Sequence, residues 1–210
     1  MPAGIRRMID DMVEPKINWR DLIKQTVQSS IKDDFTFNRT SRRTQGSGIF
    51  LPTLKKDDTI DVAVAIDMSG SISDAMAADF LAEVRGIMDE YDEFELSIVC
   101  FDTQAHAFKK FTKDTADDIQ TYECKGGGGT DFMAFWDYWI ENEIDPKVAV
   151  IFTDGYCSSN GPNQGWGPNK YVESVIWVIT GAGHSPPIPP FGTYALFDHD
   201  SGVTEIGEAG

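Results

Sequence analysis

Three polar loops carry oxygen-bearing side chains that could bind one divalent cation. The first loop, residues 67–71, follows the hydrophobic run DVAVAI and offers a carboxylate and two hydroxyls on alternate residues. The second follows four glycines, and the third follows the hydrophobic run KVAVIF. The candidate ligands are Asp67, Ser69, Ser71, Thr130 and Asp154, with Asp131 as a candidate for orienting the second loop. Because these donors are all oxygens, the set favours Mg²⁺, or Mn²⁺ or Ca²⁺, over zinc and copper.

The strands and helices predicted around these loops indicate where the loops lie in the fold. Residues 61–66, 94–101, 147–155 and 173–180 contain apolar, β-branched runs typical of strands buried on both faces of a parallel sheet. Helical patterns separate them, so the sequence predicts an α/β fold with a doubly wound, mostly parallel central sheet flanked by helices. In such sheets, ligands bind beyond the carboxyl ends of the strands. The three loops are therefore expected on one edge.

Weaker patterns extend this fold. The alternating run 105–111 predicts a short edge strand, and residues 193–198 predict a last strand. A stretch beginning after Asn18 has a helical apolar stripe. We expect a helical and extended N-terminal segment over 1–56, which packs on the main domain or serves as a docking arm, then a main domain over 57–200 and a tail over 201–210.

The charge is strongly acidic and unevenly distributed. Residues 1–56 hold 11 Lys and Arg against 6 Asp and Glu, whereas residues 57–210 hold 7 against 28, which gives the net −16. A body this acidic repels phosphate backbones, so nucleic acid is excluded as a partner. No apolar run is long enough for a membrane span and no secretory signal begins the sequence, so an intracellular, cytoplasmic location is expected.

The cysteines are few and scattered. Cys100, Cys124 and Cys157 form no C-x-x-C pair, which argues against structural zinc and against a disulfide framework. Cys100 lies within the apolar run LSIVCF, so a buried, unreactive thiol is expected there.

The ordered trio D-x-S-x-S, G-G-T-D and T-D-G, over residues 67–155, resembles the metal-ion-dependent adhesion site of von Willebrand factor A (VWA) domains. The resemblance covers about residues 59–200. It implies that the hydroxyls of Ser69, Ser71 and Thr130 bind the metal, with Asp67 and Asp154 binding directly or through water. It also implies metal-mediated protein binding without catalysis, in which a partner protein donates an acidic side chain to the metal.

A second, more specific resemblance involves the N-terminal segment of the chain. The segments KINWRDLI, FTFNRTSRR and GIFLP, followed by the metal loop, resemble bacterial and phage VWA-containing metallopeptidase-like proteins. Those proteins carry an H-E-x-x-H motif that is missing from this sequence, so protease activity is not carried over. Relatives of this type work beside ring-shaped ATPases, which implies such an ATPase as a partner. The chain would then be a component or truncated member of that family.

The residues of these loops also allow other functional interpretations. A Mg²⁺-dependent phosphohydrolase also begins with an Asp after a hydrophobic strand, but it needs a second Asp two residues later, where this chain has Ser69. The glycine loop lacks the Gly-Lys-Ser/Thr of a P-loop, and no G-x-S-x-G elbow marks a serine nucleophile. A structural domain with a vestigial metal site is a third reading. For Trp166, contact with a partner and packing in the core are equally good interpretations.

Overall fold

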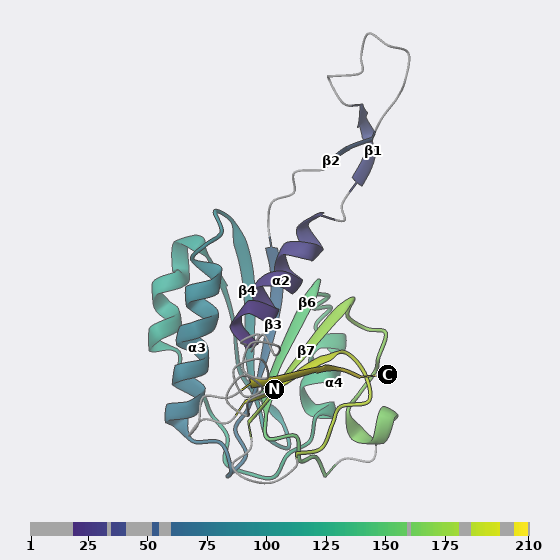
Figure 1. The fold of residues 1–210 in the computed structure, drawn as a ribbon. Helices are drawn as coiled ribbons and strands as arrows, with labels where there is room; N and C mark the ends of the chain where they lie inside the picture. The colour runs from purple at the N-terminus through teal and green to yellow at the C-terminus, as the bar shows by residue number, and fades with distance from the viewer. Residues whose placement is uncertain are drawn as a thin grey trace, which may run out of the picture.

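A seven-stranded mixed sheet forms the centre of the molecule (Figure 1). The computed structural model describes residues 19–32, 35–40, 52–54, 60–158, 161–180, 186–197 and 204–209. The strand order is β5-β4-β3-β6-β7-β8-β9. The strands are β3 (Ile60–Asp67), β4 (Phe94–Phe101), β5 (Ala105–Thr112), β6 (Val148–Thr153), β7 (Ser174–Thr180), β8 (Thr193–Phe197) and β9 (Thr204–Glu208).

The predicted α/β class is confirmed, and the sheet is parallel except at its two edges. Strands β4, β3, β6, β7 and β8 run parallel, whereas β5 and β9 pair antiparallel with β4 and β8. The predicted edge strand over 105–111 is therefore β5. Strand β9 lies within the segment 201–210 that the sequence set apart as a tail. Its run TEIGE is short, charged and interrupted by glycine, so periodicity did not reveal it.

Helices cover both faces of the sheet. On one face, α2 (Trp19–Lys32) and α3 (Asp74–Met88) share a core with alternate residues of β3, β4, β6 and β7. On the other, α4 (Met133–Glu141) packs an aromatic core against the sheet. Strand residues alternate between the two cores because successive side chains point to opposite faces. Figure 1 shows α3 and α4 on either side of the central strands.

Helix α2 shows that part of the N-terminal segment packs on the main domain. Its buried residues Ile23 and Val27 join the first core, and the Trp19 ring stacks on Phe80 of α3 at 5.4 Å. Strands β1 (Phe35–Thr40) and β2 (Pro52–Leu54) form a separate antiparallel pair. Residues 1–18 of the predicted N-terminal segment, Asn18 included, lie outside the described residues.

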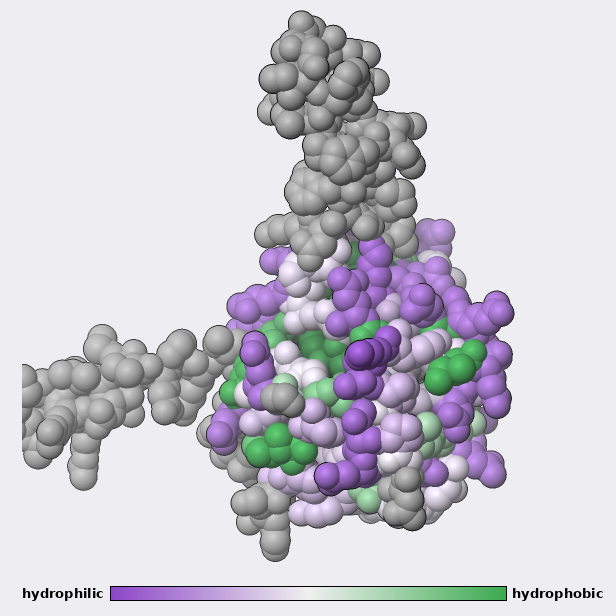
Figure 2. All heavy atoms as spheres, turned by 90° about the vertical axis from the view of Figure 1, so that its right-hand side faces the viewer, coloured by the Kyte–Doolittle hydropathy of each residue, from purple (hydrophilic) through white to green (hydrophobic). Residues whose placement is uncertain are grey.

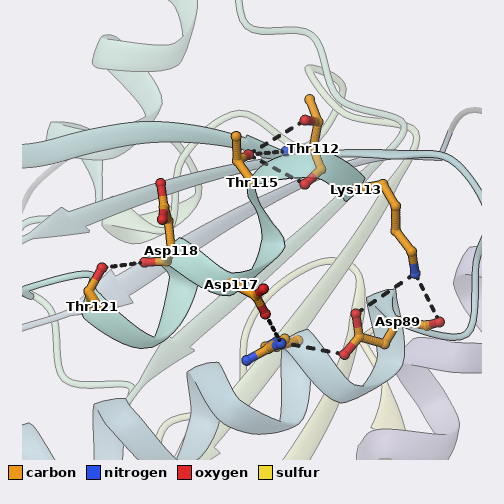
Figure 3. Close-up of polar contacts among 8 residues, drawn as sticks. Asp89, Thr112, Lys113, Thr115, Asp117, Asp118 and Thr121 are labelled. Carbon is orange, nitrogen blue, oxygen red and sulfur yellow. Dashed lines mark hydrogen bonds and ion pairs between the residues drawn. The ribbon is translucent and has the colours of Figure 1, made fainter.

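The connection from β5 is a 3₁₀ helix, η1 (Lys113–Thr121), held against α3 by ion pairs (Figure 3). Arg85 of α3 contacts Asp117 at 2.6 Å and Asp89 at 3.6 Å. Lys113 reaches the carbonyl oxygen of Asp89 at 3.2 Å. At the start of η1, the Thr112 N–H donates to Thr115 Oγ1 at 2.9 Å. These contacts show how tertiary neighbours stabilise η1.

Among the described residues of the crossover between β6 and β7, the only helix is the short η2 (Pro162–Gly165), because this segment is rich in Gly, Pro and Asn, which form helices poorly. Asn163 and Gln164 both have positive φ, at 53° and 60°. Trp166 follows them, is 6% exposed, and contacts Trp177 at 4.9 Å between ring centroids. This decides between the two readings of Trp166: it is a packed core aromatic.

The surface carries scattered apolar side chains. Figure 2 shows hydrophobic patches separated by hydrophilic residues on the face it presents. Three large hydrophobic residues are exposed in the described part of the chain, namely Ile140, Tyr156 and Ile188. Among the described residues, no helix combines the length and apolar character that crossing a membrane requires.

Asp61, half-buried near the start of β3, should make stability depend on pH. Burial, followed by the negative charge of Glu95 beside it, raises the pKa of Asp61 to about 6. A raised pKa means that the folded state binds the proton more tightly, so stability is lost as the pH rises through 6. Asp61→Asn should therefore be more stable than wild type by about 1 kcal/mol at pH 8, after allowance for solvent screening.

Urea unfolding at pH 4 and pH 8 measures this effect. The gain of Asp61→Asn should shrink toward pH 4, whereas the exposed Asp114→Asn should show no such trend. An equal effect of Asp61→Asn at both pH values would contradict the prediction.

Candidate metal centre

The ends of β3 and β6 bring two of the three polar loops together. These strands are adjacent and parallel, and Ile66 is paired with Phe152. The next residues, Asp67 and Thr153, therefore lie side by side at the carboxyl edge of the sheet, and Asp154 follows one position later. Both strands are buried over almost their whole length, which anchors the loop residues on a rigid support.

Asp67 is fully buried, and both of its carboxylate oxygens have donors. The Ser69 N–H donates to Oδ1 at 2.8 Å, and the Thr153 hydroxyl donates to Oδ2 at 2.7 Å. Burial raises the pKa of Asp67, and these hydrogen bonds oppose that effect. The carboxylate is thus held in one orientation before any ligand arrives.

A chain of side-chain oxygens leads outward from this buried carboxylate. Ser69 Oγ lies 3.1 Å from Ser71 Oγ, and Ser71 Oγ donates to Asp154 Oδ2 at 2.5 Å. The other oxygen of Asp154 accepts from the Tyr156 N–H at 3.0 Å. Ser69 is buried, Asp154 is half-buried and Ser71 is exposed. These side-chain oxygens therefore extend from the buried interior to the protein surface at the carboxyl edge of the sheet.

The second loop, which carries Thr130, is joined by backbone contacts to the segment that follows Asp154. The carbonyl oxygen of buried Thr130 accepts from Ser158, both from its N–H at 3.0 Å and from its hydroxyl at 2.7 Å. These bonds join Thr130 to the segment that follows Asp154. Asp131 accepts from the Met133 N–H at 2.9 Å, which orients the loop at the start of α4.

Asp102, at the end of β4, organises the glycine loop and was missed by the sequence reasoning. Its side chain accepts from the N–H groups of Gln104 at 3.0 Å and Gly128 at 3.3 Å, and it pairs with His106 Nε2 at 3.0 Å. Burial would raise the pKa of Asp102, but these hydrogen bonds and the charge of His106 outweigh it and lower the pKa. The sequence feature that could have identified Asp102 is its position directly after a buried strand.

Thr153 and Gly126 were also missed. Thr153 is fully buried, donates to Asp67, and accepts from the Gly155 N–H at 3.0 Å, so it joins the loops that follow β3 and β6. At Gly126, a Cβ atom would lie 2.5 Å from Met68 Cβ, so only glycine allows this close approach to the first loop. The sequence features that could have identified them are the position of Thr153 directly before Asp154 and, for Gly126, the run of glycines.

The donor set decides which ion this site fits. Among the described residues, no group of three or more His, Cys, Asp or Glu side chains could hold a metal. The cluster offers instead two carboxylates and neighbouring hydroxyls, which suit a hard cation that keeps some of its waters. The residues therefore fit Mg²⁺, Mn²⁺ or Ca²⁺ and do not fit zinc or copper.

A mostly parallel sheet covered by helices on both faces, with polar loops at its carboxyl edge, is an α/β architecture consistent with VWA-like domains. The chain belongs to the family described as VWA-like domain (DUF2201), whose model matches residues 62–198. No curated protein matches the chain significantly.

Solved structures with similar folds have low sequence identity. The conserved hypothetical protein BatB from Bacteroides thetaiotaomicron is 16% identical, with a TM-score of 0.47, over 72% of this chain and 81% of that one. The ArnB paralog VWA2 from Sulfolobus acidocaldarius is 15% identical, with a TM-score of 0.47, over 58% of this chain and 35% of that one. An aerotolerance-related membrane protein from Bacteroides fragilis is 16% identical, with a TM-score of 0.45, over 71% and 82%. The metallopeptidase-like relationship stays a prediction.

Proposed function

We propose that this chain is a protein-binding domain that depends on a divalent cation held at the carboxyl edge of its sheet. The observation that carries the proposal is a cluster of oxygen-bearing side chains from two loops. The Asp67 carboxylate accepts from the Ser69 N–H, and the side-chain oxygens of Ser69, Ser71 and Asp154 form a hydrogen-bonded series. Such a convergence of oxygen donors at one sheet edge is the arrangement that a hard cation needs.

In this proposal, each residue has its own part. Ser69, Ser71 and Thr130 supply hydroxyl oxygens, and Asp67 and Asp154 supply the negative charge, directly or through water. Thr153 keeps the Asp67 carboxylate oriented, and Asp131 orients the loop that carries Thr130. The bound cation, Mg²⁺ or else Mn²⁺ or Ca²⁺, supplies a positive charge and a coordination position open to a partner.

Electrostatics explains why partner binding should require the cation. Residues 57–210 hold 28 acidic against 7 basic residues, and Asp67, Asp102 and Asp154 all lie at this edge. This edge without a cation repels an acidic side chain. With a cation it attracts one, so we propose a protein partner that donates a carboxylate. The exposed Tyr156 beside Asp154 offers an apolar contact to the same partner.

Added Mg²⁺ or Mn²⁺ should raise the melting temperature of the protein. A cation that binds only the folded state adds about 2.7 kcal/mol at a hundredfold excess over its Kd. For a chain of this size, that shifts the melting temperature by roughly 5–10 °C. The double variant Ser71→Ala/Asp154→Asn should lose the shift and keep the fold, because neither side chain belongs to the buried core. Differential scanning calorimetry with and without chelator measures both.

Asp137→Asn on the exposed face of α4 is the matched control, and it should keep the full metal-induced shift. Equal melting temperatures with chelator and with excess metal would contradict the proposal.

The partner itself can be sought by a metal-dependent pull-down from the native host, with chelator as control. Retention of a ring-shaped ATPase is the outcome that the finer family resemblance implies. Metal-dependent hydrolysis of a generic phosphate ester, lost in Asp67→Asn, would instead support a phosphohydrolase.

A further inference from the structure

Two of the three exposed large hydrophobic residues in the described part of the chain lie near the candidate metal centre. Tyr156 is 53% exposed, and its N–H donates to Asp154 Oδ1 at 3.0 Å. Ile188 is 59% exposed and belongs to the connection between β7 and β8. Single exposed apolar side chains are normal on a protein surface, so the question is whether these two lie together.

A backbone contact holds the segment of Ile188 against the loop that carries Asp154. Gly155 has φ 82°, and a Cβ atom at this position would lie 3.3 Å from the Pro187 carbonyl oxygen and 3.4 Å from Pro187 Cδ. Tyr156 and Ile188 are the next residues of the two segments, so standard backbone dimensions place their Cα atoms within roughly 12 Å of each other. Both side chains are therefore available to the same short segment of a partner.

The segment that carries Ile188 is firmly restrained. Ile188 stands between two pairs of prolines, at 186–187 and 189–190, and each proline ring fixes its own φ. Phe191, which follows, is buried in the aromatic core, and its carbonyl oxygen accepts from the Trp177 indole N–H at 3.0 Å. An exposed isoleucine on such a backbone loses little conformational entropy when a partner covers it, which favours binding.

We propose that Tyr156, Pro187 and Ile188 form an apolar platform that selects the partner of the metal centre. This inference rests on the proposed function and adds the chemistry of the partner, which is an acidic side chain with a large apolar residue next to it in sequence. Asp154 joins the two parts of the site, because its carboxylate belongs to the oxygen cluster and also accepts from the Tyr156 N–H. A carboxylate is common to many protein surfaces, so the apolar contact supplies the specificity.

Binding of short peptides to the full chain tests this inference. The probes are three immobilised peptides that carry Leu-Asp-Leu, Ser-Asp-Ser or Leu-Asn-Leu between glycines, measured by surface plasmon resonance in Mn²⁺ and in chelator. Leu-Asp-Leu should bind about tenfold more tightly than Ser-Asp-Ser, because its leucines bury apolar surface on the platform. Leu-Asn-Leu should not bind, since it lacks the carboxylate, and chelator should abolish all binding.

Matched variants assign the preference for Leu-Asp-Leu to the platform. Ile188→Ser and Tyr156→Ser should each reduce this preference by about threefold or more, because each removes apolar contact area from an exposed site. The control is Ile140→Ser. Ile140 is 46% exposed near the end of α4, which leads away from this edge toward the start of β6, so its variant should keep the full preference.

The melting temperature in Mn²⁺ reports the cation, whereas the peptides report the platform, so the two failures are distinguishable. Two outcomes would overturn the platform alone, in protein whose melting temperature Mn²⁺ still raises. One is no difference between Leu-Asp-Leu and Ser-Asp-Ser, whether both bind or neither does. The other is a full preference retained in both Ile188→Ser and Tyr156→Ser. Equal melting temperatures with chelator and with metal would contradict the proposed function, and the platform with it.

Discussion

Trp177→Ala is expected to lower the free energy of unfolding by about 4 kcal/mol. Trp177 lies on β7, near the centre of the sheet, and is fully buried. Its ring contacts Trp166, Phe132 and Phe191 at centroid distances of 4.9, 5.6 and 5.7 Å. Its indole N–H donates to the Phe191 carbonyl oxygen at 3.0 Å. Truncation therefore leaves a cavity among aromatic rings and an unsatisfied buried carbonyl.

Urea denaturation followed by circular dichroism measures this loss. Ile188→Ala is the matched control, because Ile188 is 59% exposed and should change stability by less than about 0.5 kcal/mol. A loss of under about 1 kcal/mol in Trp177→Ala would show that the aromatic core is not packed as described.

Thr153→Val is expected to lower the free energy of unfolding by about 2 kcal/mol and to weaken metal binding at least about tenfold. Valine keeps the volume but removes the hydroxyl that donates to Asp67 Oδ2 at 2.7 Å and accepts from the Gly155 N–H at 3.0 Å. A buried carboxylate then loses one of its donors. The turn that carries Asp154 loses its anchor to the first loop at the same time.

Thr153→Ser separates the role of the hydroxyl, which orients the Asp67 carboxylate, from the packing of the Thr153 methyl group. Serine keeps the hydroxyl and removes a methyl group, so it should cost about 1 kcal/mol of stability and leave metal affinity near that of wild type. Isothermal titration with Mn²⁺ measures the affinities. Equal metal affinities for the valine and serine variants would refute the positioning role of Thr153.

Much of the sheet was predictable because its inner strands are covered on both faces. The apolar, β-branched runs of β3, β4, β6 and β7 are typical of strands covered on both faces, and the helical patterns between them favour parallel crossovers. From that topology alone, the loops after β3 and β6 had to meet at one edge. The structure places their side chains within hydrogen-bonding distance.

The parts that escaped prediction depend on contacts between distant segments. Strand β9 has little pattern of its own and forms because the edge of β8 offers it hydrogen bonds. Cys100 was expected to be a buried, unreactive thiol, and it is buried. Its contact with the Tyr122 hydroxyl, at 3.4 Å, was not predictable, because it depends on the path of the chain after η1. The packing of Trp166 likewise depends on aromatic residues from α4 and β7.

The amino-acid sequence by itself determined the α/β class, the parallel inner strands and the set of oxygen-bearing candidates at their ends. These follow from local periodicity and from residue chemistry, which need no knowledge of distant neighbours. Only the tertiary structure decided that Thr153 joins the loops after β3 and β6, that Asp102 holds the glycine loop, and that the Tyr122 hydroxyl meets Cys100 of β4. Those contacts depend on strand register and loop path, which are set by the packing of the whole chain.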